Sequence, residues 1–503
     1  MTLGRSFSVA VRGLDGDIVE IEADIAAGLP GVHLVGLPDA ALQESRDRVR
    51  AAITNCGRRW PMSRLTLALS PATLPKTGSL YDIALAAAVL SAGRKVPWDR
   101  LEKTVLLGEL ALDGRVRPVR GVLPAVLAAR SQGWTVVLVP SANLAEASLA
   151  PGVTVLGVPS LQDLLNWLDT GCGLDSGLRH RVAATEPTAD LADVVGQSQA
   201  RFAVEVAAAG SHHVMLTGPP GVGKTMLAQR LPGLLPDLSE DESLEVTAIH
   251  SVAGQLRADT PLITRPPFIA PHHCSTVASV VGGGSGLARP GAVSRAHRGV
   301  LFLDECAELG SSVLEALRTP LEEGEIRIAR RDGVVSYPAR FQLVLAANPC
   351  PCAPAQARDC ICTPLQRRRY LGKLSGPLLD RVDLRVFLHT VRAGAFATEV
   401  PESSEQVRAR VAAARCAAAQ RWGPEGCSTN AEVQGSLLRR KFRPGPAAMA
   451  PLRTALDRGL LSLRGVDRTL RVAWSLADLG GRTVPTLDDV TVALSFRGSV
   501  VQP

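Results

Sequence analysis

Short apolar runs alternate with polar turns over the first third of the chain. An apolar run of about four to eight residues between turn residues predicts a strand, and a longer apolar stretch predicts a buried helix. The predicted strands cover residues 66–69, 104–107, 135–139 and 153–158, and the predicted helices cover 80–92 and 122–129. This alternation predicts a domain of mixed type, α/β or α+β, over residues 1–170.

The middle of the chain has the order of a parallel nucleotide-binding sheet. A helix at 199–209 leads into an apolar strand at 214–217, which ends in a Gly/Pro-rich loop before another helix. Further apolar strands at 300–303 and 341–346 also end abruptly in polar residues. Strands of this kind carry ligand sites beyond their carboxyl ends. We therefore expect an α/β core over residues 191–390.

Changes in composition mark the two ends of this core. Residues 171–189 lose the apolar periodicity and are rich in Gly, Ser and Thr, which predicts a linker over 171–190. Beyond about residue 390 the chain is rich in Ala, Arg and Leu, with helical patterns at 404–421 and 465–479. We expect a C-terminal helical domain, a lid, over residues 391–503.

The composition excludes several classes of protein. The chain has 503 residues, 46% hydrophobic and 20% charged, with mean hydropathy +0.14, which predicts a globular protein of about three domains. The first thirty residues carry charges and no continuous apolar stretch, so we expect no signal peptide, and no apolar run approaches the roughly 18 residues that span a bilayer, so we expect no membrane segment. Without an export signal, the ten cysteines predict a reduced, cytoplasmic protein, and the net charge of +7 favours a polyanionic partner.

One loop of the predicted core carries a phosphate-binding motif. Residues 218–225 match G-x-x-x-x-G-K-[ST] between a predicted strand and a predicted helix. Backbone N–H groups of such a loop surround phosphate oxygens, Lys224 reaches the β- and γ-phosphates, and the Thr225 hydroxyl binds Mg²⁺. We expect ATP and Mg²⁺ here, and a fortuitous glycine-rich turn is the less favoured alternative. The candidate residues are Gly218, Pro219, Pro220, Gly221, Val222, Gly223, Lys224 and Thr225.

Two further strands end in side chains suited to ATP hydrolysis. The strand at 300–303 is followed by Asp304 and Glu305, which predict a Mg²⁺ ligand and a base for the attacking water. Such a strand end alone is more often merely solvated, but beside a phosphate loop the catalytic interpretation is favoured. The strand at 341–346 leads to Asn348, whose amide could orient the water or contact the γ-phosphate. The pattern predicts hydrolysis in addition to binding.

At Asn348 the sequence resembles the AAA+ ATPases, in which this asparagine is the first sensor. Ordered motifs at residues 282–285, 289–291, 296–305 and 375–383 are similar to those of the magnesium-chelatase-like AAA+ group. Together with the N-terminal region they resemble the ComM (YifB) family over nearly the whole chain. The resemblance implies an AAA+ P-loop NTPase core with a helical lid, assembled as a homo-oligomeric ring, a hexamer.

The resemblance also implies roles for two arginines. Arg381, in the segment Leu-Leu-Asp-Arg-Val-Asp, matches the arginine finger that reaches the γ-phosphate held by a neighbouring subunit. Arg464 matches the second sensor on the lid, and Arg468 and Arg471 lie close enough in the sequence to be alternatives. Without the family match, each of these side chains would more often be a solvated surface arginine.

The N-terminal region has two segments that look like the Lon-protease fold. Residues 75–82 look like its segment P-K-D-G-P-S-A-G, and residues 116–123 look like V-L-P-I-G-G-L-K. Lon proteases attack with a serine that a lysine activates, but the matching positions hold Leu80 and Leu123. We expect a Lon-protease-like α/β domain without the catalytic dyad, serving as an oligomerisation collar or a nucleic-acid guide. Two side chains of the catalytic types lie nearby but out of register, Lys76 and Ser79.

Cysteines and histidines follow two of the core motifs. Four thiolates within thirteen residues, in the pattern C-x-C-x₇-C-x-C, could form a tetrahedral, structural Zn²⁺ site. Four reduced thiols in a loop are an equally weighted alternative. His272 and His273 are adjacent, so on an extended segment they point to opposite faces, and we expect a loop at the pore or a subunit contact. The cysteines are Cys350, Cys352, Cys360 and Cys362.

Two basic segments are candidates for contact with DNA. Residues 326–335 predict a hairpin with an Asp-Gly turn, and in ring ATPases that this chain resembles a hairpin here faces the pore. Arginines near its tip could hold phosphates without reading the sequence of bases. Either segment alone would more often be an ordinary solvated surface. The candidates are Arg327, Arg330 and Arg331 in the hairpin, and Arg367, Arg368 and Arg369 further on.

The resemblance implies a DNA helicase that promotes branch migration in homologous recombination, notably of DNA taken up in natural transformation. Its partner would be single-stranded or branched DNA, without sequence preference. ATP hydrolysis follows from the residues themselves, whereas the DNA partner follows from the family and is supported by charge. Two alternatives are an ATPase subunit of the magnesium-chelatase type, which inserts metal into a tetrapyrrole, and an AAA+ remodeller that threads protein through its ring.

Overall fold

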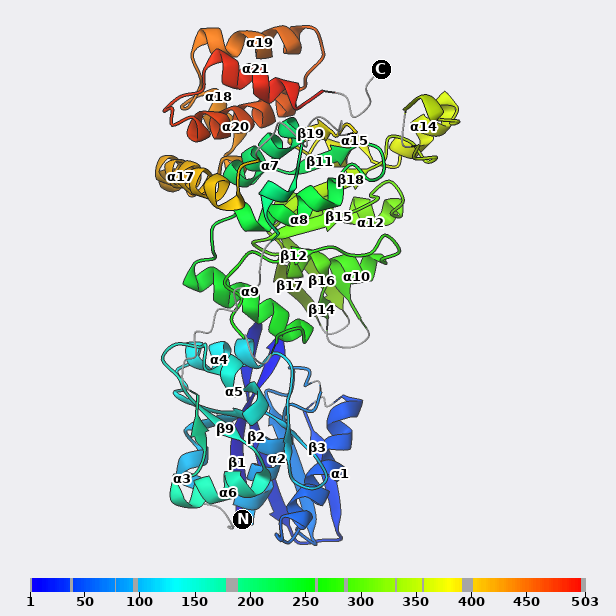
Figure 1. Ribbon diagram of the computed structural model, residues 1–503. Coiled ribbons are helices and arrows are strands. Elements are labelled where there is room, and N and C mark those ends of the chain that lie inside the picture. Colours follow the sequence, from blue (N-terminus) through cyan, green and yellow to red (C-terminus); the bar gives the residue numbers. More distant parts are fainter. Residues whose placement is uncertain are drawn as a thin grey trace.

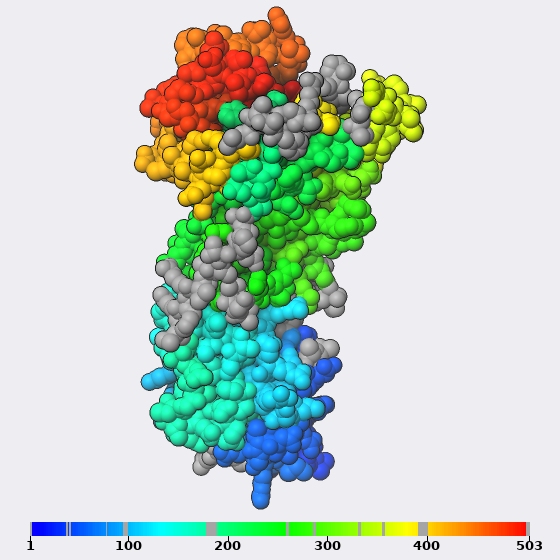
Figure 2. Space-filling view, in the orientation of Figure 1, coloured from blue at the N-terminus to red at the C-terminus, as the bar shows by residue number. Residues whose placement is uncertain are grey.

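The computed structural model arranges the chain in three parts along one long axis (Figure 1). The N-terminal part lies at one end, a parallel sheet with its helices lies in the middle, and the C-terminal helices lie at the other end. The space-filling view has the same elongated outline, from which helix α14 (Pro364–Leu371) projects to one side (Figure 2). The structure describes residues 2–36, 39–76, 78–93, 98–177, 189–257, 261–284, 288–330, 333–354, 357–390 and 401–498.

An eight-stranded sheet forms the N-terminal part, in the order β10-β9-β8-β5-β1-β2-β4-β3. Its centre is a long antiparallel hairpin of β1 and β2, in register from Thr2 opposite Ile25 to Arg12 opposite Asp15. Strand β1 also pairs in parallel with β5, and β8 and β9 continue this parallel half. The strands are β1 (Thr2–Arg12), β2 (Asp15–Ala26), β3 (Gly31–Val35), β4 (Arg64–Ser70), β5 (Thr104–Leu106), β8 (Val136–Pro140), β9 (Thr154–Val158) and β10 (Asp175–Ser176).

Helices cover this sheet, and one of them lies unusually close to it. Helix α2 is buried along nearly its whole length, and a Cβ atom placed on Gly4 of β1 would come 2.2 Å from the Ala88 carbonyl oxygen. Glycine is therefore required where α2 crosses β1. The helices are α1 (Ala40–Asn55), α2 (Asp82–Ala92), α3 (Trp98–Leu101), α4 (Val122–Ser131), α5 (Leu144–Ala147) and α6 (Leu161–Thr170), and a small hairpin joins β6 (Glu109–Leu110) to β7 (Val116–Arg117).

The predicted strands and helices of this region are all present, as β4, β5, β8, β9, α2 and α4. The hairpin of β1 and β2 was not predicted, nor was β3. Strand β10 pairs with β9 inside the stretch in which we expected a linker, and residues 178–188 of that stretch lie outside the described residues.

A five-stranded sheet, in the order β12-β15-β18-β11-β19, forms the middle part, and all of its pairings are parallel. Strands β11, β15 and β18 are buried throughout, which explains their uninterrupted apolar sequences. Because they run in the same direction, the residues after their carboxyl ends meet at one edge. The strands are β11 (Val214–Thr217), β12 (Phe268–Ile269), β15 (Val300–Leu303), β18 (Gln342–Ala347) and β19 (Leu384–Phe387).

Helices and two small hairpins surround this sheet. Helix α9 and the hairpin of β16 and β17 lie on the side toward the N-terminal part (Figure 1). The helices are α7 (Ser198–Gly210), α8 (Lys224–Leu234), α9 (Glu240–Ala253), α10 (Val277–Val281), α11 (Ala292–Arg295), α12 (Ser311–Ala316), α13 (Arg318–Glu323), α14 and α15 (Gly376–Leu379), and the hairpins are β13 (Gly282–Gly283) with β14 (Arg289–Pro290) and β16 (Glu325–Arg330) with β17 (Gly333–Pro338).

Helices alone make up the described residues from 401 to 498, as the composition predicted. Trp422 is fully buried, and its ring meets those of Phe442 and Trp474 edge-on, with centroids 4.6 and 5.4 Å away. The same apolar cluster continues into α7 and β19, so these helices pack on the core. None of the helices in the described ranges has the length and apolarity to cross a membrane. They are α17 (Ser404–Trp422), α18 (Gly435–Arg439), α19 (Pro446–Asp457), α20 (Leu463–Leu479) and α21 (Leu487–Ser495).

Candidate nucleotide-binding site

The predicted phosphate loop connects β11 to α8, at the carboxyl edge of the parallel sheet. Gly221 and Gly223 have φ angles of 76° and 93°, which side chains with a Cβ rarely adopt. A Cβ atom on Gly218 would come 2.6 Å from the Leu388 carbonyl oxygen. The backbone conformation and the close contacts of the loop therefore require glycine at these three positions. Helix α8 begins at Lys224, so its positive end faces the loop.

Lys224 connects the phosphate loop to the predicted sensor. Its Nζ donates hydrogen bonds to the carbonyl oxygens of Gly218 and Pro219, both at 2.8 Å, and to Asn348 Oδ1 at 3.0 Å. Burial lowers the pKa of Lys224, and the carboxylates of Asp304 and Glu305 oppose that shift. The structure thus brings together a cation and an amide that lie 124 residues apart in the sequence.

Asp304 and Thr225 form the second pair at this edge. Thr225 Oγ1 donates to Asp304 Oδ2 at 2.7 Å, and the backbone N–H of Glu305 donates to Asp304 Oδ1 at 2.9 Å. A hydroxyl and a carboxylate oxygen side by side are the hard ligands that Mg²⁺ prefers. The donor set therefore fits a magnesium ion that is shared with a bound triphosphate.

Glu305 is held in an uncommon conformation. Its φ angle of 47° lies in the left-handed region, which costs about 1–3 kcal/mol for a residue other than glycine. Its side chain is half exposed, and its Oε2 lies 3.5 Å from His273 Nδ1. The structure places His273 beside Glu305, and a position at the pore or at a subunit contact stays a prediction. The clue in the sequence is that His273 follows β12, the parallel neighbour of β15.

The two arginines implied by the resemblance differ in their surroundings. Arg381 is nearly buried, pairs with Glu322 at the end of α13 and donates to the Pro377 carbonyl oxygen. Arg464 is exposed in the first turn of α20 and forms no hydrogen bond or ion pair with the residues that the structure describes. Its alternatives are both engaged: Arg468 donates to Asp383 and Arg471 to the Val433 carbonyl oxygen. Of the three side chains on α20, only Arg464 remains free within the described part.

A buried ion pair joins α20 to the sheet. Asp383 is 2% exposed at the start of β19 and accepts from Arg468 Nη1 at 2.8 Å. His212 Nδ1 lies 3.4 Å from the same carboxylate. Burial alone would raise the pKa of Asp383, but Arg468 and the neighbouring histidines hold it well below its usual range. Asp383 is therefore ionised at neutral pH and completes the contact between the C-terminal helices and the core.

The candidate DNA residues lie in two places. In the hairpin, β16 and β17 pair as predicted, with Arg327 opposite Ser336. The Arg327 guanidinium is largely exposed but pairs with Glu325 in its own strand, and Arg331 lies outside the described residues. Helix α14 presents a row of exposed arginines on the projection visible in Figure 2. The residues in question are Arg327 and Arg330 on β16, and Arg367, Arg368 and Arg369 on α14.

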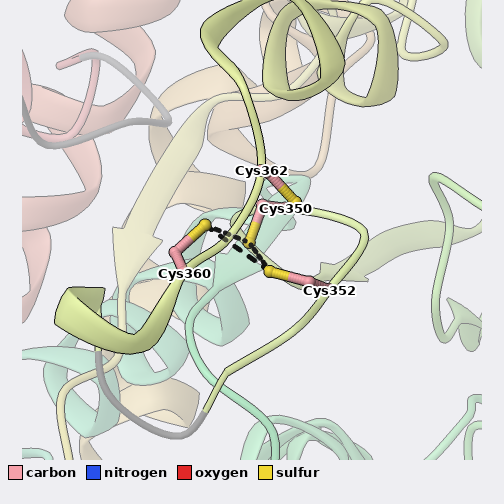
Figure 3. A group of neighbouring side chains, drawn as sticks. All are labelled: Cys350, Cys352, Cys360 and Cys362. Atoms are coloured by element: carbon pink, nitrogen blue, oxygen red, sulfur yellow. Dashed lines mark hydrogen bonds between the residues drawn. The ribbon is translucent and has the colours of Figure 1, made fainter.

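The four cysteines are brought together between β18 and α14. Their side chains meet between the two arms of one loop, and all four sulfur atoms lie within 4.8 Å of one another (Figure 3). None of them is in a disulfide. The structure therefore brings together the four cysteines that the sequence pattern singled out.

The side chains that could supply a Lon-type dyad have other partners. Ser79 donates to Glu109, and the fully buried Lys76 donates to the carbonyl oxygens of Leu69 and Pro71. Burial lowers the pKa of Lys76. Leu123 is fully buried in α4.

Comparison with known proteins adds three family models that together cover most of the chain. The model described as magnesium chelatase, subunit ChlI, matches residues 190–396. The model for subunit ChlI of Mg-chelatase matches residues 21–143, and the model for the ChlI C-terminal region matches residues 401–497. The phosphate loop, Asp304, Glu305, Asn348 and Arg381 fall within the first of these matches, and Arg464 falls within the match to the C-terminal region.

Several relatives match along the full length, among them proteins from three different bacteria. An uncharacterized protein of Mycobacterium tuberculosis is 77% identical over 99% of both chains. YifB of Escherichia coli is 38% identical over 99% of this chain and 97% of its own, and competence protein ComM of Haemophilus influenzae is 36% identical over 99% and 98%. Two matches are partial: the magnesium-chelatase 38 kDa subunit of Rhodobacter capsulatus, 27% identical over 63% of this chain and 89% of its own, and the Lon protease of Mycolicibacterium smegmatis, 30% identical over 28% and 18%.

Proposed function

Because this chain belongs to the ComM/YifB family of magnesium-chelatase-like AAA+ proteins, we propose that it is a ring-forming ATPase that drives branch migration of DNA. The proposal of ATPase activity depends on one observation: the carboxyl ends of β11, β15 and β18 meet at one edge of the parallel sheet. At this edge Lys224 contacts Asn348, and Thr225 contacts Asp304. Similarity to a competence protein over the full length supports DNA as the substrate. The motor would act in the cytoplasm, in homologous recombination and natural transformation.

Each side chain at the edge has a role in this proposal. Lys224 binds the β- and γ-phosphates, while Thr225 and Asp304 hold Mg²⁺, which neutralises phosphate charge. Glu305 accepts a proton from the attacking water, and Asn348 orients that water against the γ-phosphate. The contacts of Lys224 with the loop and with Asn348 support these assignments, because they place its ammonium group between the two.

Two further residues complete the site in a hexamer. Arg381 reaches the γ-phosphate of the neighbouring subunit, and to do so it exchanges its contact with Glu322 for the phosphate. Arg464, which is exposed and free of partners within the described part, senses the nucleotide from the lid. The exposed position of Arg464 supports its choice over Arg468 and Arg471, which are both engaged.

The remaining parts of the chain would serve the ring. We assign residues 1–170 to a Lon-like, non-proteolytic domain, 171–190 to a linker, 191–390 to the ATPase core and 391–503 to the lid. The partners of Ser79 and Lys76 support the absence of peptidase activity, because both side chains are already engaged. DNA phosphates would contact the arginines of the hairpin and of α14, without reading the base sequence.

A second candidate function is an ATPase subunit of the magnesium-chelatase type. The family models carry that name, and the 38 kDa chelatase subunit matches part of the chain. Under this alternative, a tetrapyrrole-binding partner raises the rate of ATP hydrolysis, whereas DNA leaves the rate unchanged. A protein remodeller would respond to an unfolded polypeptide instead.

One assay separates these functions. ATP hydrolysis by the full-length protein is measured alone and with linear duplex, single-stranded and four-way-junction DNA, at two salt concentrations. We expect stimulation by single-stranded and junction DNA that weakens at the higher salt, because phosphate contacts are screened. ATP-dependent movement of the junction, scored by strand exchange, would then identify branch migration. No response to any DNA, at either salt, would refute the motor.

Two variants test the chemistry itself. Glu305→Gln should bind ATP but hydrolyse it at least about 100-fold more slowly, because the base is lost while the phosphate contacts remain. Lys224→Ala should lose ATP binding. The matched control is Glu323→Gln, an exposed carboxylate on α13, which should hydrolyse ATP like the wild type. Equal hydrolysis by the Glu305→Gln protein would refute the assigned base.

A further inference from the structure

The cysteine cluster has the dimensions of a single metal centre. Three of its sulfur pairs are 3.4–3.5 Å apart: Cys350 with Cys352, Cys350 with Cys360, and Cys352 with Cys360. A tetrahedral ion with metal–sulfur bonds of about 2.3 Å separates its sulfurs by about 3.8 Å. A disulfide would require about 2.05 Å. The observed spacing is therefore close to that of four thiolates around one ion.

Hydrogen-bond donors surround the cluster in the way that thiolates require. The backbone N–H of Ala353 donates to the Cys350 carbonyl oxygen at 3.2 Å and lies near the Cys350 sulfur, and the N–H of Cys362 lies near the Cys360 sulfur. The N–H of Cys352 lies near the Cys362 sulfur, so each arm of the loop places an N–H group beside a sulfur. Ala353 has a φ angle of 42°, a conformation uncommon for alanine, which forms the turn after the first cysteine pair. Donors of this kind offset the charge of metal-bound thiolates.

The cluster is also tied to helix α14. The Arg367 guanidinium, in the first turn of α14, lies near the Cys360 sulfur. Thr363 caps the helix one residue after Cys362, and its side chain accepts from the backbone N–H of Gln366. The cysteine loop therefore leads into the start of α14.

The last turn of α14 reaches the candidate nucleotide site. Tyr370 is buried, and its hydroxyl group lies near the backbone N–H of Asn348. Just beyond the helix, Lys373 pairs with Glu308 at 3.3 Å. Helix α14 thus lies between the cysteine loop at one end and Asn348, the residue that contacts Lys224, at the other end.

We propose that Cys350, Cys352, Cys360 and Cys362 bind one Zn²⁺ ion, and that this ion fixes α14 so that Tyr370 holds Asn348 in place. The soft, four-sulfur donor set favours Zn²⁺ over the hard cations of the nucleotide site. The ion is structural, since all four coordination positions are filled by the chain. The metal-binding part of this proposal stands without the ATPase, and the effect on Asn348 rests on the proposed function.

Metal content tests the site directly, whatever the activity. Full-length protein purified without added metal is analysed for zinc and iron by mass spectrometry, and we expect about one zinc per chain. The double variant Cys360→Ser/Cys362→Ser should lose that zinc. The matched control Cys172→Ser/Cys416→Ser changes two exposed cysteines outside the cluster and should keep it. Iron in place of zinc, no metal, or full zinc in the first variant would each overturn the site.

A second measurement covers the case in which the double variant fails to fold. Wild-type protein is stripped with a chelator and refilled with Co²⁺, which should give the visible absorption bands of tetrahedral cobalt thiolate. Featureless spectra after refilling would overturn the four-cysteine assignment.

Hydrogen exchange tests the structural role. On removal of the metal from the wild type, peptides that cover residues 343–350 and 364–371 should exchange faster, and zinc should restore their protection. Peptides of α20 should not change, since that helix lies outside the loop. Unchanged exchange in both segments would overturn the effect on α14 and Asn348, even if zinc is bound. Because exchange is read without ATP, this outcome is distinct from a failure of the ATPase.

Discussion

Replacing Asp383 with asparagine should strongly destabilise the contact between α20 and the parallel sheet. The carboxylate is 2% exposed and pairs with Arg468 at 2.8 Å, and it also accepts from the backbone N–H of His213 at 3.3 Å. The asparagine side chain would keep the shape but leave the Arg468 charge without its partner. Arg468 retains a second bond, to the Arg381 carbonyl oxygen at 2.7 Å, and its side chain is 19% exposed.

These contacts set the size of the effect. Breaking a buried ion pair by removing one charge costs about 3–5 kcal/mol, and the partial exposure of Arg468 places this case near the lower end, at about 3 kcal/mol. For a unit of 150–250 residues, each kcal/mol lowers Tm by about 2–4 °C, so we expect a loss of about 6–12 °C. The assay is thermal unfolding followed by tryptophan fluorescence, because Trp422 and Trp474 lie in the same apolar cluster.

Two further measurements distinguish this explanation from simple loss of packing. Asp383→Asn/Arg468→Met removes both charges and should recover part of the lost stability. Because the pKa of Asp383 is lowered in the folded protein, its contribution is present above the unfolded value of about 3.9 and is lost as the pH falls below it. The wild type and the variant should therefore differ at pH 7 and converge below about pH 4. A Tm loss under about 2 °C for Asp383→Asn would refute the reasoning. So would a double variant whose loss of stability equals the sum of the losses in the two single variants.

Three more variants test other contacts. Under its proposed role as an arginine finger, Arg381→Ala should leave ATP affinity unchanged and lower turnover by roughly 10³-fold; a normal rate in a steady-state hydrolysis assay would contradict this. His273→Ala should lower kcat about tenfold at constant KM for ATP, because it frees the Glu305 carboxylate from its neighbour, and a change in KM alone would contradict that role. Trp422→Ala should lower the free energy of unfolding by about 3–5 kcal/mol in urea titrations, because Trp422 is fully buried. A loss below about 1 kcal/mol would contradict this, since it would mean that the neighbouring side chains fill the cavity.

The candidate site could be predicted from the sequence where its chemistry is local. The loop at 218–225 carries its glycines, lysine and threonine within eight residues, so one segment was enough. Asp304 and Asn348 were predictable because each follows an apolar strand, and parallel strands of one sheet end at the same edge. Contacts between distant segments were not predictable. Nothing in the local pattern pairs His273 with Glu305 or Arg381 with Glu322.

The missed hairpin of β1 and β2 has a definite physical cause. Its inward positions include Gly4, Ser6 and Ser8, which hide the alternation of apolar residues expected of a half-buried strand. These small residues are present because α2 lies close against β1, where Ser6 Oγ donates to the Ala84 carbonyl oxygen at 2.7 Å. The close packing of α2 on β1 thus requires small residues at buried positions of β1. In the sequence these residues look like those of a solvent-exposed segment.

Helix α9 is one of the contacts between the N-terminal part and the part that carries the candidate nucleotide site. Helix α9 spans about 21 Å at 1.5 Å per residue, and near its end Ser251 donates to Glu146 of the N-terminal part. One or two turns earlier, Glu245 pairs with His297 at 2.8 Å. His297 lies three residues before β15, and Asp304 follows the other end of β15. Under the proposed function, a movement of the N-terminal part caused by DNA would be transmitted to Asp304 through α9 and β15, without contact between the DNA and the nucleotide.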